Sequence, residues 1–173
     1  NKMDWNPVVI ENTSEVNKAF FAGRCDVLTS DSSQLAAQRA VAPNPADYKV
    51  LPEIISKEPL APVVRHGDDQ WYDIVNWTVM GLINAEELGI HSGNVDDMLK
   101  SNDPKIKRFL GVTPGMGEAL GLDDAFMYNV IKQVGNYGEI FERNVGTDTA
   151  LGLERSLNAL WTEGGLMYAS PFR

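Results

Sequence analysis

The sequence predicts an α/β protein in which a strand–helix alternation is followed by a long, nearly all-helical part. Short apolar runs alternate with helical patterns over the first fifty residues. Near residue 60 this changes, and apolar residues then recur mainly at helical spacing. Hydrophobic residues make up 43% of the 173 residues, which is enough to bury a sizeable core.

Three strands are predicted, over residues 7–10, 26–29 and 48–54. The first reads Pro-Val-Val-Ile and is rich in β-branched residues, which favour strands. With a helix between each pair, the order is βαβαβ, which predicts a parallel sheet with right-handed crossovers. Parallel sheets normally have more strands than three, so the sequence predicts an incomplete domain.

Capping residues define the two helices between these strands. Asn12 or Thr13 can cap the first helix, and Gly23 is placed to end it in a left-handed conformation. Asp31 or Ser32 can cap the second, which runs toward Ala40 before two prolines end it.

Beyond residue 60 the pattern predicts a series of helices. The longest begins near Asp68 and ends near Gly89. Others begin at Asn94 and at the Asp103–Pro104 pair, where proline occupies the first helical position. Apolar stripes predict two more helices, over 126–134 and roughly 148–163.

Charge excludes two classes of partner. The chain carries 15 Lys and Arg against 24 Asp and Glu, a net charge of −9. An acidic surface repels nucleic-acid phosphates and anionic lipids, so neither is expected to bind. No apolar run reaches about 18 residues, so no transmembrane helix is predicted.

No catalytic or metal site is predicted from the reactive side chains. His66 and His91 are the only histidines and Cys25 is the only cysteine, so a zinc-ligand set is lacking. Both histidines lie beside a glycine or a helix end and are expected on the surface. The glycine-rich segment 115–121 follows no predicted strand, which makes it a helix–helix turn rather than a dinucleotide loop. We expect no cofactor and no metal ion.

Asp31 is the residue whose position points to a ligand. It follows the strand 26–29 and precedes a helix, and open α/β sheets bind ligands at the carboxyl ends of their strands. A carboxylate there can hold a ligand ammonium through charge-assisted hydrogen bonds. From the residues alone, plain helix capping is the more ordinary interpretation.

Five segments along the chain carry long motifs: AGRCDVLTSDSSQL (22–35), VLPEIISKEPLAPVVRHGDDQWYDIVNWT (50–78), INAEELGI (83–90), IKQVGNYGEIFERNVG (131–146) and LNALWTEGGLMYASPFR (157–173). They resemble the general L-amino-acid-binding proteins of bacterial ABC importers, in solute-binding protein family 3, and the similarity covers essentially the whole chain. Motifs this long in one register are far more specific than a short glycine motif. The first residues resemble the middle of the family's chain, and the last stretch resembles its natural C-terminus. The resemblance therefore implies a C-terminal half whose N-terminal half is absent.

This resemblance implies a periplasmic-binding-protein-like type II fold, an α/β architecture of two lobes joined by a hinge. It makes residues 1–55 the second part of lobe 2, 56–60 the return hinge, and 61–173 the C-terminal part of lobe 1 with extra helices. The change of pattern near residue 60 agrees with this division. The implied location is the periplasm of a Gram-negative bacterium.

The implied function is capture of a free L-amino acid in the cleft between the lobes and its delivery to permease subunits in the inner membrane. Asp31 is the implied contact of the ligand α-ammonium, and Thr29 and Ser30 line the same strand end. The family's carboxylate-binding arginine lies in the absent half, and neither Arg24 nor Arg65 is expected to replace it.

Cys25 matches a position that is paired with an upstream cysteine in close relatives. The resemblance implies a disulfide whose partner lies outside this chain, which suits an oxidising periplasm.

Two other functions stay open at this point, although the resemblance implies no enzyme. Cyclohexadienyl dehydratases share the fold, but they need a general acid in the cleft, and this half supplies only Asp31. A signalling input module is the third alternative, and the absence of an output domain counts against it.

Overall fold

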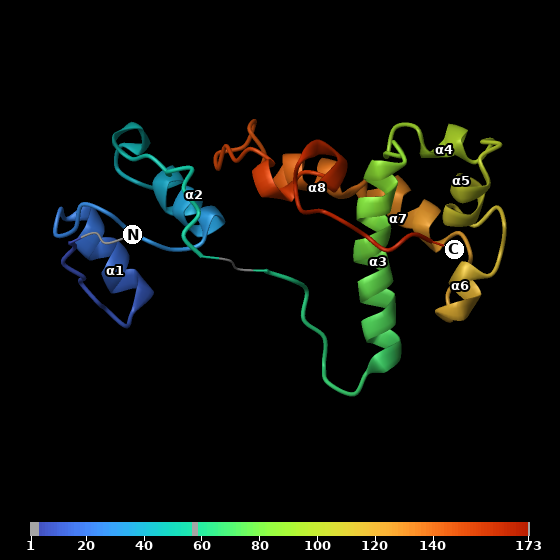
Figure 1. Ribbon diagram of the computed structural model, residues 1–173, viewed down its shortest axis with the longest axis horizontal. Helices are drawn as coiled ribbons and strands as arrows, with labels where there is room; N and C mark the ends of the chain where they lie inside the picture. The colour runs from blue at the N-terminus through green and yellow to red at the C-terminus, as the bar shows by residue number, and fades with distance from the viewer. Residues whose placement is uncertain (1–3, 57–58, 173) are drawn as a thin grey trace. The chain divides into compact units, whose positions relative to one another are not determined.

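The computed structural model describes residues 4–56 and 59–172. The chain divides into two compact units: unit 1 comprises Asn1–Glu58 with Ala150–Leu153, and unit 2 comprises Pro59–Thr149 with Glu154–Arg173. Figure 1 shows the helices of each unit along the chain. None of the helices within the described ranges is both long and apolar enough to cross a membrane.

Unit 1 contains the helices α1 (Thr13–Phe21) and α2 (Ser32–Ala40) and the 3-10 turn η1 (Pro45–Asp47). Asn12 caps α1, because its side-chain oxygen accepts hydrogen bonds from the backbone N–H groups of Ser14 at 2.9 Å and Glu15 at 3.3 Å. Both helices therefore form where their capping signals predict them.

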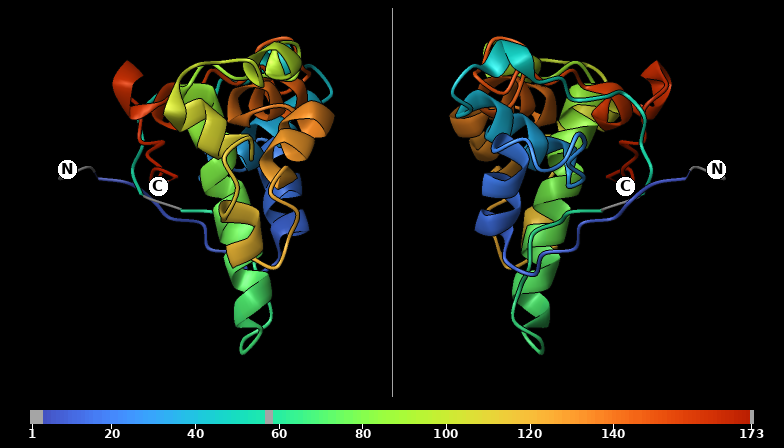
Figure 2. Two further views of the ribbon diagram at one scale, coloured as in Figure 1. Left: turned by 90° about the vertical axis from the view of Figure 1, so that its right-hand side faces the viewer. Right: turned by 90° about the vertical axis from the view of Figure 1, so that its left-hand side faces the viewer.

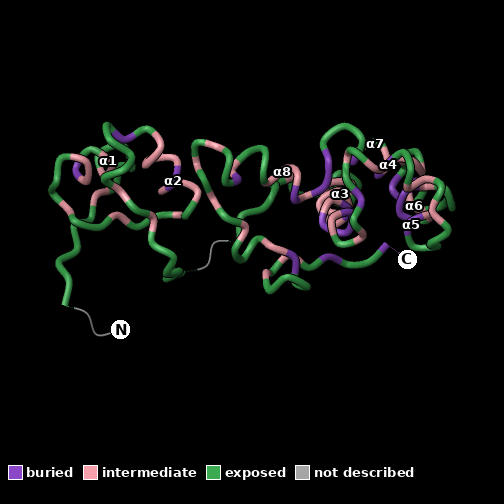
Figure 3. Tube along the Cα trace, turned by 90° about the horizontal axis from the view of Figure 1, so that it is seen from above, coloured by how far each residue is buried: buried purple, intermediate pink, exposed green. Residues whose placement is uncertain are grey.

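The core of unit 1 is small. Phe20, Phe21 and Tyr48 form an aromatic cluster with ring centroids 5.1 to 5.6 Å apart. Ala19 of α1 and Ala36 of α2 are buried. Figure 3 shows few buried residues in this unit, so much of its apolar surface stays open.

The predicted strands 7–10, 26–29 and 48–54 do not form a sheet. Among the described residues there is no β ladder, and the single isolated bridge joins Leu160 to Met167. Apolar side chains in or beside these segments remain exposed, with Val9 at 91% and Ile55 at 81% of full exposure. β-branched residues supply the tendency to extend, but a strand also needs a partner for its backbone N–H and C=O groups. The three segments do not provide partners for one another.

Unit 2 contains the remaining helices. The longest is α3 (Asp69–Glu87), which is 19 residues long and begins where the sequence predicts, with the Asp68 side chain accepting from the Trp71 N–H at 3.2 Å. The others are α4 (Val95–Met98), α5 (Pro104–Phe109), α6 (Met116–Ala119), α7 (Phe126–Val134), α8 (Tyr137–Asn144) and the 3-10 turns η2 (Ser156–Asn158) and η3 (Trp161–Glu163).

The core of unit 2 forms around α3, which packs against α7 and α8. Figure 2 shows α3, in green, from two sides. Phe172 joins the core from the end of the described chain, with its ring centroid 5.3 Å from that of Trp77 and 5.2 Å from that of Phe109. Gly81 allows α3 and α7 to approach closely, since a Cβ there would overlap Cε of Met127. Unit 2 therefore has a dense core of its own.

The predicted helix over 148–163 is wrong. Gly152 has φ +61° and Ser156 has φ +44°, and left-handed residues at these two positions interrupt an α-helix. The chain forms the short turns η2 and η3 instead, and Leu160 is buried where it bridges to Met167. The leucines in this stretch therefore recur at helical spacing although the chain forms no continuous helix there.

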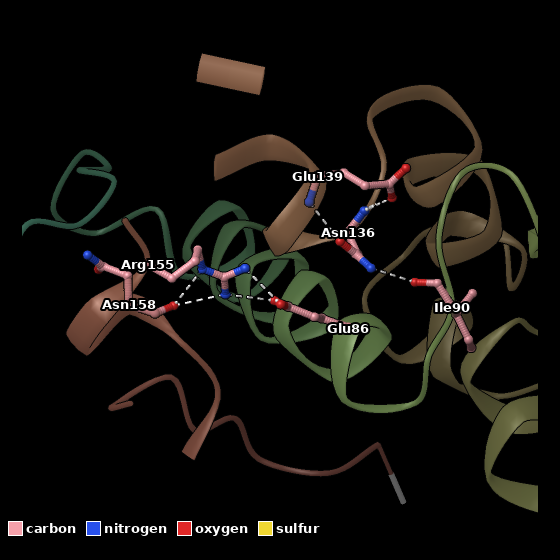
Figure 4. A network of polar contacts seen from close by, with 6 residues as sticks. All are labelled: Glu86, Ile90, Asn136, Glu139, Arg155 and Asn158. Carbon is pink, nitrogen blue, oxygen red and sulfur yellow. Dashed lines mark hydrogen bonds and ion pairs between the residues drawn. The ribbon is translucent and has the colours of Figure 1, made fainter. Parts of the chain in front are cut away.

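Asn136 is a buried polar residue that joins α8 to the end of α3 (Figure 4). Its side-chain oxygen accepts from the Glu139 N–H at 2.9 Å, and its amide donates to the Ile90 carbonyl at 2.9 Å. Glu139 completes a capping box by accepting from the Asn136 N–H at 2.8 Å. The same carboxylate accepts from the backbone N–H and hydroxyl of Ser92.

Replacing Asn136 should destabilise the protein. Asn136→Ala removes the cap of α8 and leaves the Ile90 carbonyl without its side-chain donor, at a combined cost of about 2–3 kcal/mol in the free energy of unfolding. Urea unfolding followed by circular dichroism measures this. Asn144→Ala, an exposed position at the end of the same helix, is the control and should have little effect. Equal stability of the two variants would contradict the role of Asn136.

The stability of unit 2 should fall in acid through Glu139. Burial raises the pKa of this carboxyl, but hydrogen bonds from Ser92 and the Asn136 backbone outweigh it, so the pKa lies below its usual value. A depressed pKa contributes stability above the pKa of the unfolded chain, and that stability is lost as the pH falls through the folded-state pKa. Glu139→Gln should therefore be less stable than the parent at neutral pH, and the difference should shrink below about pH 4. Unfolding curves measured from pH 3 to 7 test this, and a constant difference would contradict it.

Candidate functional site

The candidate site lies where residues 26–31 lead into α2. Thr29 and Ser30 are exposed, and Asp31 is half-buried at the N-cap position of the helix, with φ −57° and ψ 143°. The Asp31 carbonyl accepts the first helical hydrogen bond, from the Leu35 N–H at 2.9 Å. Thr29, Ser30 and Asp31 therefore lie together at one end of α2.

The Asp31 carboxylate does not cap the helix. Its side chain accepts no hydrogen bond from the first turn of α2, whereas the capping side chains of Asn12, Asp68 and Asp103 all do so in their own helices. Over residues 4–56 and 59–172, no hydrogen bond or ion pair involves this carboxylate. Asp31 therefore occupies the N-cap position, but the interpretation of its side chain as the cap is wrong. The carboxylate is left available for another partner.

A hollow of about 150 Å³ adjoins this end of α2 within unit 1. Thr29 and Ser30 line it, together with side chains of α1 and α2, while Asp31 is outside its lining. The Ser30 hydroxyl donates to the side-chain oxygen of Gln34 at 2.6 Å. Thr29 therefore presents the freer hydroxyl of the two.

The other side chains considered from the sequence lie mostly at the surface. Arg24 and Arg65 are exposed, His66 and His91 are exposed as expected, and Cys25 is a free, half-buried thiol. Within the described ranges, no group of three or more His, Cys, Asp or Glu side chains could hold a metal ion.

Sequence reasoning missed two arginines. Arg39, in the last turn of α2, donates to the Leu151 carbonyl at 3.0 Å. Arg155 forms an ion pair with Glu86 at 2.8 Å, and both side chains are less than one-fifth exposed. The partners are 112 and 69 positions away in sequence, so no local pattern could have identified either contact.

A solved structure defines the class of protein to which this fold corresponds. A periplasmic binding protein of an ABC transporter from Brucella ovis, determined with glutathione bound, is 51% identical with a TM-score of 0.89. The match covers 99% of this chain and 54% of that chain. This chain is therefore similar in fold and sequence to about half of a periplasmic binding protein of an ABC transporter.

The particular relatives are amino-acid-binding proteins. The general L-amino acid-binding periplasmic protein AapJ of Rhizobium johnstonii is 57% identical over all of this chain and 51% of its own length. The glutamate/glutamine/aspartate/asparagine-binding protein BztA of Rhodobacter capsulatus is 52% identical over all of this chain and 52% of its own length. YhdW of Escherichia coli, a putative amino-acid ABC transporter-binding protein, is 51% identical. No protein-family profile matches the chain.

These findings confirm the resemblance stated from the sequence and, through the solved structure, the periplasmic-binding fold class. The expected periplasmic location is confirmed as well, because the relatives are periplasmic proteins. The chain spans about half the length of the curated relatives that it matches.

Proposed function

We propose that this chain forms half of an extracytoplasmic receptor that captures L-amino acids and delivers them to an ABC transporter permease. The observation that carries the proposal is identity of 51–57% along the whole chain to proteins named for binding amino acids or for amino-acid transport. Identity at this level extends through both units, so it supports a shared activity more strongly than a likeness of fold alone.

Within this receptor, Asp31 binds the ligand α-ammonium. An ammonium group donates charge-assisted hydrogen bonds, and a carboxylate with no partner of its own can accept them without breaking an existing contact. Thr29 and Ser30 add hydroxyl groups at the same end of α2. The partly buried position of Asp31 reduces competition from water for the bound ammonium.

The ligand carboxylate is bound by the other half of the receptor. Arg24 and Arg65 remain unassigned to this task. A receptor that recognises the α-ammonium and α-carboxylate can accept many side chains, because those two groups are common to all amino acids. The N-terminal half of the same protein and the permease subunits are therefore the proposed protein partners.

A dehydratase activity on the same scaffold has no observation in its favour. The relatives described above carry binding-protein names, and none is named as an enzyme. Turnover of prephenate or arogenate by the complete protein would instead favour the enzyme.

Asp31→Asn in the complete protein should weaken amino-acid binding at least tenfold. Asparagine keeps the size and N-cap preference of the residue, so α2 should persist while the negative charge is lost. Losing one charged hydrogen-bonding partner costs about 1.5–3 kcal/mol of binding free energy. Isothermal titration calorimetry with L-glutamate, L-glutamine and L-leucine measures the change.

The matched control is Asp26→Asn, which makes the same change of charge at an exposed carboxylate five positions earlier. This variant should bind as the parent does. Equal affinity of Asp31→Asn and the parent would remove Asp31 from the site, and absence of amino-acid binding by the parent would overturn the receptor function itself.

We also propose that Cys25 forms a disulfide with a cysteine outside this chain. In the complete protein purified without reductant, Cys25 should resist alkylation and become reactive after reduction, as peptide mass spectrometry can show. The control is Cys25→Ser, which should release one reactive thiol elsewhere in the protein. Alkylation of Cys25 before reduction would contradict the disulfide. Such a bond is worth about 2–4 kcal/mol, so Cys25→Ser should also unfold more easily.

A further inference from the structure

The segment Ala150–Leu153, called here the crossover segment, belongs to a different unit from its neighbours in sequence. It is part of unit 1, whereas Pro59–Thr149 before it and Glu154–Arg173 after it belong to unit 2. The chain therefore passes between the units twice at this segment, in addition to the passage at residues 58 and 59.

Arg39 secures the crossover segment in unit 1. Its guanidinium donates to the Leu151 carbonyl at 3.0 Å, in a partly buried contact. A charged donor makes a stronger hydrogen bond to a carbonyl than a neutral donor makes. Arg39 lies in the last turn of α2, so this bond ties the C-terminal end of that helix to the crossover segment.

Arg155 secures the chain where it returns to unit 2 (Figure 4). Its guanidinium donates to both Glu86 oxygens, at 2.8 and 3.1 Å, and to the Asn158 carbonyl at 2.9 Å. The same group lies 5.3 Å from the ring centroids of Tyr137 and Phe141. The return of the chain is therefore held by an ion pair, a hydrogen bond and two cation–π contacts.

The backbone turns sharply at and after the crossover segment. Gly152 takes φ +61°, which a glycine adopts without steric cost. Ser156 takes φ +44°, and among the described residues no other non-glycine has a positive φ. Such a conformation persists only where the surrounding contacts impose it. The neighbouring Arg155 supplies contacts of that kind.

We propose that Arg39, through its hydrogen bond to the crossover segment, positions α2 within unit 1. A nine-residue helix moves as one body, so fixing its last turn also fixes its first, where Asp31 lies. Arg39 is then a positioning residue for the ligand site. This part rests on the proposed function, whereas the restraint of α2 by Arg39 does not.

Hydrogen exchange of the complete protein without ligand tests the restraint. Arg39→Gln should speed amide exchange in α2 and in the crossover segment together, because both lose their shared contact. Arg39→Lys keeps a charged donor and should restore much of the protection. Arg24→Gln, an exposed arginine in the same unit, is the control and should leave both segments unchanged. Unchanged exchange in Arg39→Gln would overturn the proposal.

Calorimetry of the same variants tests the consequence for binding. Arg39→Gln should raise the Kd for amino acids about threefold to tenfold, the range expected for one lost hydrogen bond, with partial recovery in Arg39→Lys. Faster exchange with an unchanged Kd would overturn the positioning role of Arg39 at the ligand site while leaving its restraint of α2 in place. If the parent binds no amino acid, the proposed function fails, and the exchange result still decides whether Arg39 restrains α2. Glu86→Gln, which loosens the return at Arg155, should speed exchange in the crossover segment and gives a second test should Arg39→Gln not fold.

Discussion

The need of extended backbone for hydrogen-bonding partners governs unit 1. Residues 7–10, 26–29 and 48–54 have the composition of strands, yet they form no ladder, and apolar side chains such as Val9 stay exposed beside them. The relatives are about twice as long as this chain. Unpaired backbone and open apolar surface are what is expected where the remaining half supplies the pairing strands. Because the predicted strands are unpaired, the core of unit 1 is limited to the aromatic cluster and the buried alanines of its two helices.

Unit 2 depends on a different interaction, which is side-chain packing around one long helix. The core combines α3 with α5 and α7 and with Phe172 from the far end of the described chain. Asn136 and Glu139 satisfy the backbone where α8 begins, and Arg155 joins the return of the chain to Glu86. Local capping and long-range packing thus favour the same structure within this unit. Such consistency is characteristic of a region that folds to one structure.

Sequence reasoning succeeded where the signal was local. The helices near Asp68 and over 126–134 form as predicted because caps, prolines, glycines and apolar stripes act within a few residues. It failed where the outcome depends on distant partners. The predicted strands lack neighbours, and Leu160 packs in a cluster with Ile83 and Ala169 rather than on the face of a helix over 148–163. At the site, the sequence located Asp31 at the start of α2. Because aspartate is a common N-cap residue, the sequence did not indicate that its side chain makes no capping hydrogen bond. The contacts of Arg39 and Arg155 span too many residues to leave any pattern.

The close approach at Gly81 has a mechanical consequence for unit 2. Because Cε and Sδ of Met127 occupy the space that a side chain at Gly81 would need, α3 and α7 interlock and neither can slide along the other without displacing Met127. Met127 is fully buried in a close-packed core, so sliding of α3 along α7 would have to displace other core side chains as well.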